Sequence, residues 1–243
     1  MAGTKEGEGR DGQNVAQVHA RLRTAILHGE IPAGTTTSQV VLSRDFEVGR
    51  TPLREALRML QAEGLILSEP NRRVRIAEFS IDDLEQLYVM RIALETTAAR
   101  ITTPDLHPSD IAEMEGLMAQ MDHLVDVEPI DFARAHLAFH ACFVRGGGDR
   151  LLSLITQLYE HAERYRIAFR ETLPDRWLDR RAEHRAMIDA AKEGDAEAVA
   201  VAIATHYALT AKGVASGLDP AHELRALRIA VAAVSPSAIA VLD

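Results

Sequence analysis

The chain has 243 residues, of which 47% are hydrophobic and 26% are charged, a composition typical of a globular protein with one large or two smaller domains. No apolar run reaches the roughly 18 residues that a membrane-spanning helix needs, and the polar, glycine-rich start is unlike a signal peptide. The single cysteine, Cys142, cannot form an internal disulfide, which fits a reducing compartment. These features argue against a membrane protein or a disulfide-rich secreted protein, and we expect a cytoplasmic one.

The net charge of −9 is unevenly distributed along the chain. Residues 1–79 hold 11 Lys and Arg against 10 Asp and Glu, whereas residues 80–243 hold 16 against 26. Affinity for nucleic acid depends on where basic groups lie and not on their sum. The total charge therefore neither supports nor excludes DNA binding.

The N-terminal third of the chain begins with a polar segment and two predicted helices. Residues 1–13 are rich in glycine and charge, and we expect a disordered tail there. Apolar residues then recur at three- and four-residue steps in a first helix that should end at Gly29. Ser38 is the predicted N-cap of a short second helix.

A third helix and a hairpin follow. Thr51 is the predicted N-cap of this helix, with Pro52 at its first position, where a missing N–H costs nothing. The segments 65–67 and 74–76 read as two short strands around a turn. Helix, helix, turn, helix and hairpin over residues 14–79 is the order of a winged helix-turn-helix.

Beyond residue 80 the sequence predicts helices and no convincing strand. The loops between them are short, so residues 80–216 should form an antiparallel bundle. The fold class is thus mainly α, with an N-terminal winged helix-turn-helix followed by an all-helical bundle. The C-terminal extension, 217–243, fits an extra helix, a dimer contact or a disordered tail. The predicted helices cover residues 80–101, 108–125, 130–146, 149–172, 174–193 and 195–216.

Arginines recur on the third predicted helix. Arg50, Arg54 and Arg58 stand four residues apart, opposite the leucine face. A guanidinium group can bond a guanine edge or a phosphate, as a helix in the major groove requires. Arg72 and Arg73 fall at the hairpin tip, where a wing would meet DNA. The arginine spacing alone fits a solvated surface better, but the helix cap, the preceding turn and the basic hairpin together favour DNA binding.

The same region resembles a known family. The run GRTPLREALRMLQAEGLI at 49–66 is similar to the signature of GntR-family regulators, and AILHGEIPAG at 25–34 to that family's first helix and turn. The resemblance implies that Arg50, Thr51 and Arg54 contact DNA.

Two positions depart from the family pattern. Gly49 stands where the family usually has Ser or Thr, which removes a potential phosphate-binding hydroxyl. Arg73 stands where the wing usually has Gly, so the shape of the wing tip should differ.

Four histidines in the predicted bundle are candidate metal ligands. His136 and His140 are four residues apart and share one helix face, while His184 and His206 lie on two later helices. Imidazoles from three helices could converge and bind a divalent transition metal. Each histidine taken alone fits a packing or surface role better.

The predicted bundle resembles the FCD ligand-binding domain of the FadR subfamily. The resemblance is carried by the run HLAFH at 136–140, the pair Glu183-His184 and His206. In that domain an Asp and three His typically hold the metal, and carboxylate effectors often complete its coordination. The resemblance maps His140, His184 and His206 onto the three histidines and puts His136 where the Asp is expected. Such an all-imidazole set should suit Zn²⁺, with Ni²⁺ or Cu²⁺ as alternatives, over Mg²⁺.

An anionic effector also needs a fixed cation. Arg91 matches an arginine of the family's first sensor helix and is a candidate effector-binding residue. Its alternative role is an intrahelical ion pair with Glu95, four residues later. Arg166 is a second, weaker candidate.

These features predict a metal- and carboxylate-responsive transcriptional regulator, expected to be a repressor that binds a palindromic DNA operator as a homodimer. A metalloenzyme is the first alternative, but no Glu or Asp base accompanies the histidines in a motif such as His-Glu-x-x-His. An architectural DNA-binding protein is the second, and polar residues at predicted core positions argue against it. We therefore expect no enzymatic activity.

Overall fold

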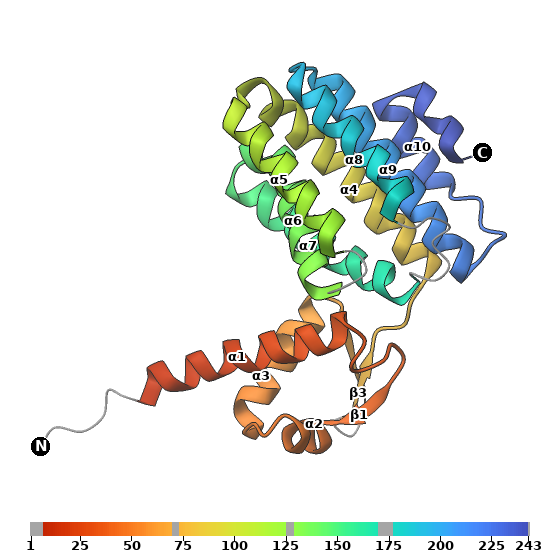
Figure 1. Ribbon diagram of the computed structural model, residues 1–243. Coiled ribbons are helices and arrows are strands. Elements are labelled where there is room, and N and C mark those ends of the chain that lie inside the picture. The colour runs from red at the N-terminus through yellow and green to blue at the C-terminus, as the bar shows by residue number, and fades with distance from the viewer. Residues whose placement is uncertain (1–6, 70–72, 125–128, 170–176, 243) are drawn as a thin grey trace, which may run out of the picture. The chain divides into compact units, whose positions relative to one another are not determined.

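The computed structural model describes residues 7–69, 73–124, 129–169 and 177–242 (Figure 1). Contacts divide the chain into two compact units, Met1–Phe79 and Ser80–Asp243, which we call unit 1 and unit 2. The division falls where the sequence predicts the boundary between the winged helix-turn-helix and the bundle.

The described part of unit 1 combines helices with a small antiparallel sheet. The central strand is β3, which pairs with β1 on one side and β2 on the other. The hairpin formed by β2 and β3 was predicted, whereas β1 was not, because three polar residues show no alternation. The elements are α1 (Gly7–Leu27), β1 (Thr36–Ser38), α2 (Gln39–Asp45), α3 (Arg50–Ala62), β2 (Ile66–Glu69) and β3 (Arg73–Ile76).

The core of unit 1 forms around the leucine face of α3. Leu53, Leu57 and Leu60 recur at helical spacing and are buried, so they remove apolar surface from water on one side of the helix only. Gly64, whose φ of +76° favours glycine, follows the end of the helix and turns the chain toward β2. The remaining members of this core are Val18, Leu22, Ile26, Leu42, Ala56, Leu65, Ile66, Val74 and Ile76.

Two predictions for unit 1 are wrong. A disordered tail was expected over residues 1–13, but α1 begins at Gly7, and residues 1–6 lie outside the described residues. Extending a helix that has already formed costs less free energy than nucleating a new one, because each added residue gains a backbone hydrogen bond. The N-cap of α3 is Gly49 and not Thr51, and it makes no side-chain capping bond. Pro52 still lies in the first turn, where no backbone N–H is required.

Unit 2 is a helical bundle in which α4 and α9 pack along each other (Figure 1). The six predicted helices are confirmed, and Ser80 and Asp195 cap α4 and α9 by accepting backbone N–H groups. The bounds are α4 (Ile81–Thr102), η2 (Thr103–Asp105), α5 (Pro108–Leu124), α6 (Pro129–Val144), η3 (Arg145–Gly147), α7 (Asp149–Ala168), α8 (Trp177–Lys192), α9 (Ala196–Leu218), α10 (Arg225–Val234) and η4 (Pro236–Leu242).

The C-terminal extension is folded onto the bundle. Leu227 and Val231 of α10 are buried, and α10 packs against α4. The backbone N–H of Leu227 donates to Oε1 of Glu85 at 3.0 Å, and Nη2 of Arg228 donates to the carbonyl of Leu242 at 2.6 Å. Of the alternatives that the sequence left open, an extra helix is therefore correct, and a disordered tail is wrong for α10 and η4.

The helix α9 is long and apolar enough to cross a membrane by length and composition. However, 67% of its most apolar window is buried inside the bundle, as expected for the core helix of a folded domain. Its apolar character is weak evidence for a membrane span.

Candidate DNA-reading helix and metal centre

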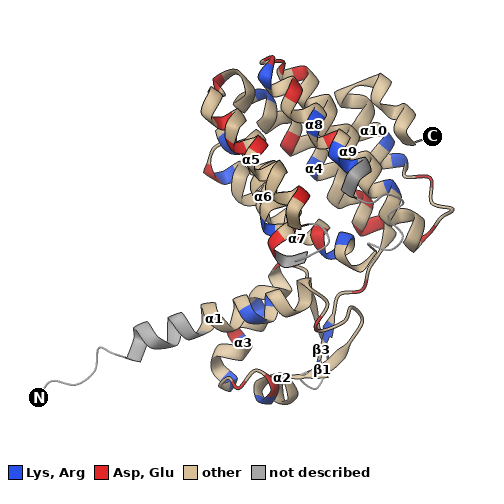
Figure 2. Ribbon diagram, viewed as in Figure 1, with Lys and Arg blue, Asp and Glu red and all other residues tan. Residues whose placement is uncertain are grey.

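The three arginines of α3 lie on its solvent side. Arg50, Arg54 and Arg58 are all exposed, while the leucine face of the same helix is buried. Figure 2 shows charges of both signs in unit 1 and over the bundle of unit 2. The helix therefore presents guanidinium groups outward, as reading a groove requires.

These arginines are not engaged inside the fold. Nη1 of Arg58 donates to both oxygens of Glu55 at 3.1 and 3.2 Å, and Nε of Arg54 lies 3.7 Å from the same carboxylate. The side chains of Arg54 and Arg58 are 58% and 68% exposed, and ion pairs this exposed contribute little. No partner of Arg50 occurs in the described parts of the chain. A DNA phosphate or base could therefore replace Glu55 at low cost.

The other candidate DNA contacts fall at the ends of elements. Thr51 is exposed in the first turn of α3. Arg73 is exposed at the start of β3, where its Cα pairs across the sheet with those of Ser38 and Glu69. Arg72 lies outside the described residues.

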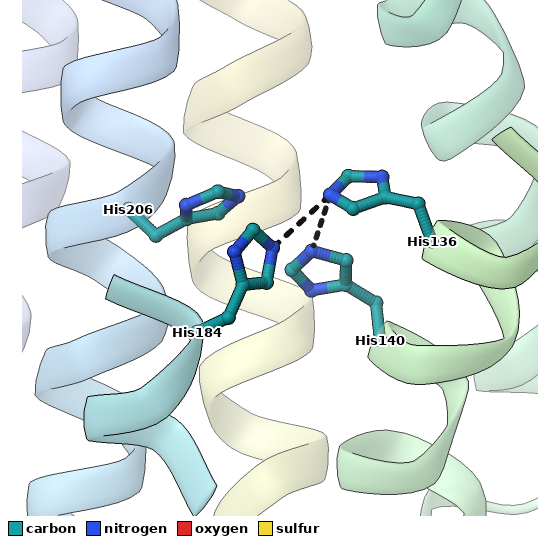
Figure 3. Close-up of side chains that lie close together, drawn as sticks. All are labelled: His136, His140, His184 and His206. Carbon is teal, nitrogen blue, oxygen red and sulfur yellow. Dashed lines mark hydrogen bonds between the residues drawn. The ribbon is translucent and has the colours of Figure 1, made fainter. Parts of the chain in front are cut away.

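The four candidate histidines converge in unit 2 (Figure 3). His136 and His140 come from α6, His184 from α8 and His206 from α9, and one ring nitrogen of each lies within 4.8 Å of the others. All four are buried, with at most 7% of the residue exposed. A short separation between several buried imidazole nitrogens is the arrangement of a transition-metal site.

The outer nitrogen of each ring has a partner, and for three of the four rings the partner determines the tautomer. Nδ1–H of His184 donates to the Arg180 carbonyl at 2.8 Å, because a carbonyl can only accept. Nδ1–H of His206 donates to the Glu183 carboxylate at 2.6 Å for the same reason. Both rings therefore direct an Nε2 lone pair toward the centre of the cluster.

Two tyrosine hydroxyls complete this outer layer. The Tyr207 hydroxyl donates to Glu95, so at 3.2 Å it accepts from Nδ1–H of His140, which leaves a third inward lone pair. Nδ1 of His136 lies 2.7 Å from the Tyr159 hydroxyl, which can donate or accept. The sequence analysis did not identify these tyrosines, because their spacing from the histidines follows from packing between helices.

Burial keeps the histidines neutral. It lowers the pKa of His136, His140 and His206 well below the usual range, and the neighbouring histidines and arginines add to the shift. Burial also lowers the pKa of His184, to about 4. The contact between His206 and Glu183 is therefore a hydrogen bond from a neutral ring and not an ion pair. Neutral imidazoles are the form that binds a metal.

His136 differs from the other three in being able to change tautomer. Its Nε2 lies 3.2 Å from Nε2 of His184 and 3.2 Å from Nε2 of His140. Since those two atoms carry lone pairs, His136 can donate to one of them when its Tyr159 partner donates to Nδ1. When Tyr159 accepts instead, the fourth Nε2 lone pair faces the centre, so the residues fit a metal ion held by four imidazoles.

Three arginines surround the cluster, and two of them were predicted from sequence. Nε of Arg91 donates to Oε1 of Glu95 at 2.8 Å, so the intrahelical pair considered from sequence is present. Its Nη2 is buried without a hydrogen-bond partner in the described residues. The guanidinium carbon of Arg91 lies 4.0 Å from the centre of the Tyr207 ring, a cation–π distance.

Arg166 and Arg180 approach from α7 and α8. Nε of Arg166 donates to Glu163 at 2.6 Å, and Nη1 of Arg180 bonds the Thr210 hydroxyl. Nε of Arg180 is buried without a hydrogen-bond partner among the described residues. Both arginines contribute to the lowered pKa of His184, which indicates that their charges reach the cluster. Arg180 belongs to no motif, so no signal in the sequence pointed to it.

Comparisons with known proteins agree with this architecture. Residues 14–76 match the family described as bacterial regulatory proteins of the gntR family, and residues 86–209 match the FCD domain. The chain belongs to the GntR family. This GntR-family chain is a transcriptional regulator and not an enzyme, with a DNA-binding unit followed by a domain of the effector-binding FCD type.

Individual relatives cover most of the chain. It is 25% identical over 79% of its length to the HTH-type transcriptional regulator YdhC of Bacillus subtilis, of which 86% is covered. It is 27% identical over 78% of its length to the HTH-type transcriptional repressor RspR of Escherichia coli, of which 84% is covered. The solved structure of Escherichia coli McbR/YncC has a TM-score of 0.68 and 20% identity, over 80% of this chain and 93% of that one, and so shares the fold.

Proposed function

We propose that this GntR-family regulator binds a divalent transition metal, with Zn²⁺ the best suited, through His136, His140, His184 and His206. The observation that carries the proposal is that four buried Nε2 atoms converge while each Nδ1 is hydrogen-bonded outside the cluster. Imidazole nitrogen suits Zn²⁺, Ni²⁺ and Cu²⁺ and not Mg²⁺. A bound metal would supply a buried positive charge that attracts an anionic effector.

We propose further that the effector is a small carboxylate that binds beside the histidines. Nη2 of Arg91 and Nε of Arg180 are buried donors without an acceptor in the described residues. A buried donor without an acceptor destabilises the fold by roughly 1–3 kcal/mol. A carboxylate oxygen that accepts from either nitrogen would remove that cost. Arg166 is proposed as a third effector-binding residue, since its charge reaches three of the four histidines.

The DNA-binding role is assigned to Arg50, Thr51, Arg54 and Arg58 of α3, with Arg72 and Arg73 of the wing. We propose a cytoplasmic homodimer that represses transcription from a palindromic operator. Dimers of helix-turn-helix proteins read half-sites about 34–36 Å apart, so a two-fold axis in the protein requires one in the DNA. The name of the relative RspR as a repressor supports the sign of regulation.

Metal content tests the first part of the proposal. Protein purified without chelator should contain about one Zn²⁺ or Ni²⁺ per chain, and adding Zn²⁺ to chelated protein should raise its melting temperature. A chain that binds no transition metal under either condition would exclude the metal centre.

Effector and operator are tested on the metal-loaded protein. Lactate, succinate and citrate represent mono-, di- and tricarboxylates, and one that binds should stabilise by about 2.7 kcal/mol at a hundredfold its Kd. Selection from a random pool of double-stranded DNA should enrich a palindrome, and the same carboxylate should release it in a gel-shift assay. Enrichment of no sequence would exclude specific DNA binding.

A further inference from the structure

In the described part of the chain, the carboxylate of Glu183 contacts the histidine cluster directly. Oε2 of Glu183 lies 2.6 Å from Nδ1 of His206. The other three histidines bond neutral groups, namely the hydroxyls of Tyr159 and Tyr207 and the carbonyl of Arg180. Of these four hydrogen-bond partners, the carboxylate on His206 is therefore the charged one.

We propose that Glu183 is a positioning residue that supplies the negative charge of the metal centre through His206, a role that rests on the proposed metal binding. Four neutral imidazoles bring no charge to a divalent cation. The guanidinium groups of Arg91, Arg166 and Arg180 also lie near enough to disfavour a further positive charge. A carboxylate one hydrogen bond from a ligand offsets both effects without occupying a coordination position.

The hydrogen bond has two consequences for His206. It holds the proton on Nδ1, so that Nε2 presents its lone pair to the cluster. It also draws the N–H proton toward the carboxylate, which raises the electron density on Nε2 and strengthens it as a ligand. The carboxylate thus substitutes for an anionic ligand at a distance, in a chain where His136 occupies the position expected for an aspartate.

Glu95 is a second carboxylate near the histidines, and it is less suited to this role. Its Oε1 accepts from Arg91 at 2.8 Å. It reaches His140 only through the Tyr207 hydroxyl. Glu183 has the shorter connection to a ligand.

The position of Glu183 on α8 links two helices to one ion. His184, the next residue, enters the cluster directly from α8, whereas Glu183 reaches a ligand on α9. A single turn of α8 therefore contributes one ligand and orients another. Metal binding should accordingly strengthen the contact between α8 and α9.

The test compares variants of the full-length protein by zinc affinity and by the melting temperature without metal. Glu183→Gln keeps the size and an acceptor but loses the charge, and Glu183→Ala loses both. We expect Zn²⁺ affinity to fall roughly 10-fold for Gln and up to about 100-fold for Ala, the range for outer partners of metal ligands. Glu183→Asp, which keeps the charge, should bind more tightly than Glu183→Gln. Asp189→Asn, at an exposed site on the same helix, is the matched control and should bind as the wild type does.

The outcomes separate this inference from the metal proposal. No zinc binding by the wild type would overturn the metal centre itself. Zinc binding by the wild type with equal affinity in Glu183→Gln would overturn only the role of Glu183. The role of Glu183 would also be overturned if Glu183→Gln lost zinc affinity only because the metal-free variant is less stable. A melting temperature without metal well below that of the wild type would show such a structural role. Replacement of zinc by Co²⁺ adds a direct readout, since a change in ligand strength at His206 should shift the visible absorption in Glu183→Gln and not in Asp189→Asn.

Discussion

The two units use polar residues at the same helical spacing in opposite ways. On α3 of unit 1, Arg54 and Arg58 stand four residues apart and are exposed, with only the carboxylate of Glu55 between them. On α6 of unit 2, His136 and His140 also stand four residues apart, but both are buried, and each outer ring nitrogen has a hydrogen-bond partner. Equal spacing thus gives a surface in one unit and an enclosed site in the other.

The difference shows how each kind of site is built. A surface that reads DNA needs charges that are free to leave their internal partners, because binding exchanges those partners for phosphates and base edges. A metal centre needs ligands held in place before the ion arrives, and hydrogen bonds to the outer nitrogens do this.

The largest effect is expected at the enclosed site. His140→Ala removes one of four converging nitrogens, and Zn²⁺ affinity should fall by more than about 100-fold, beyond the cost of losing an outer partner alone. Isothermal titration of chelated protein with Zn²⁺ measures it. His123→Ala, at an exposed histidine on α5, should leave the affinity unchanged. Similar losses in both variants would show that the buried cluster has no special role.

The exposed arginines should lose less. Arg54→Ala should weaken binding to a selected operator by about 1–3 kcal/mol, roughly 5- to 150-fold, if the guanidinium group bonds a base edge. Stability should not change, because the side chain is largely exposed. Arg150→Ala, at an exposed position on α7, is the matched control in a fluorescence anisotropy titration. Equal operator affinity in wild type and Arg54→Ala would remove this residue from the DNA surface.

A smaller effect of opposite sign is expected at Glu55. Glu55→Gln removes a negative charge between Arg54 and Arg58, so binding to any DNA should tighten by about 0.2–1 kcal/mol, the size of an exposed ion pair. The gain should shrink at high salt, where exposed charges are screened. Weaker operator binding in this variant would instead mean that Glu55 itself accepts from a base.

The smallest effect concerns the attachment of the C-terminal extension to α4. Burial alone would raise the pKa of Glu85, but hydrogen bonds from His222 and the Leu227 N–H lower it overall. The Glu85 hydrogen bond raises the pKa of His222. The carboxylate contribution is lost as pH falls through the lowered pKa of Glu85, and the imidazole contribution is lost as pH rises through the raised pKa of His222.

The pair should therefore stabilise most between the unperturbed pKa values of 4.5 and 6.5. The difference in melting temperature between wild type and His222→Gln should be largest in that window and should shrink above it. A difference that is constant from pH 5 to pH 9 would contradict a charged pair. At the proposed metal site, the contributions of single histidines could not be separated in this way, because protons would compete with the ion at every ligand.

Local sequence signals predicted the order of elements because they depend on neighbours along the chain. The leucine spacing of α3 and the cap at Ser38 are set by backbone hydrogen bonding within a few residues. The N-cap of α3 was misplaced by two residues, since Gly49 offers no side-chain signal. The strand β1 escaped prediction because only its pairing with β3 makes it a strand.

For the site, the sequence by itself determined that His136 and His140 share a helix face and that the arginines of α3 lie opposite its leucines. Only the tertiary structure decided that Glu183 meets His206, that Tyr207 joins His140 to Glu95, and that Arg180 reaches the cluster. The physical reason is the distance along the chain over which each kind of interaction acts. Helical periodicity acts over a few residues, whereas a buried polar group must be matched by whichever helix packs against it.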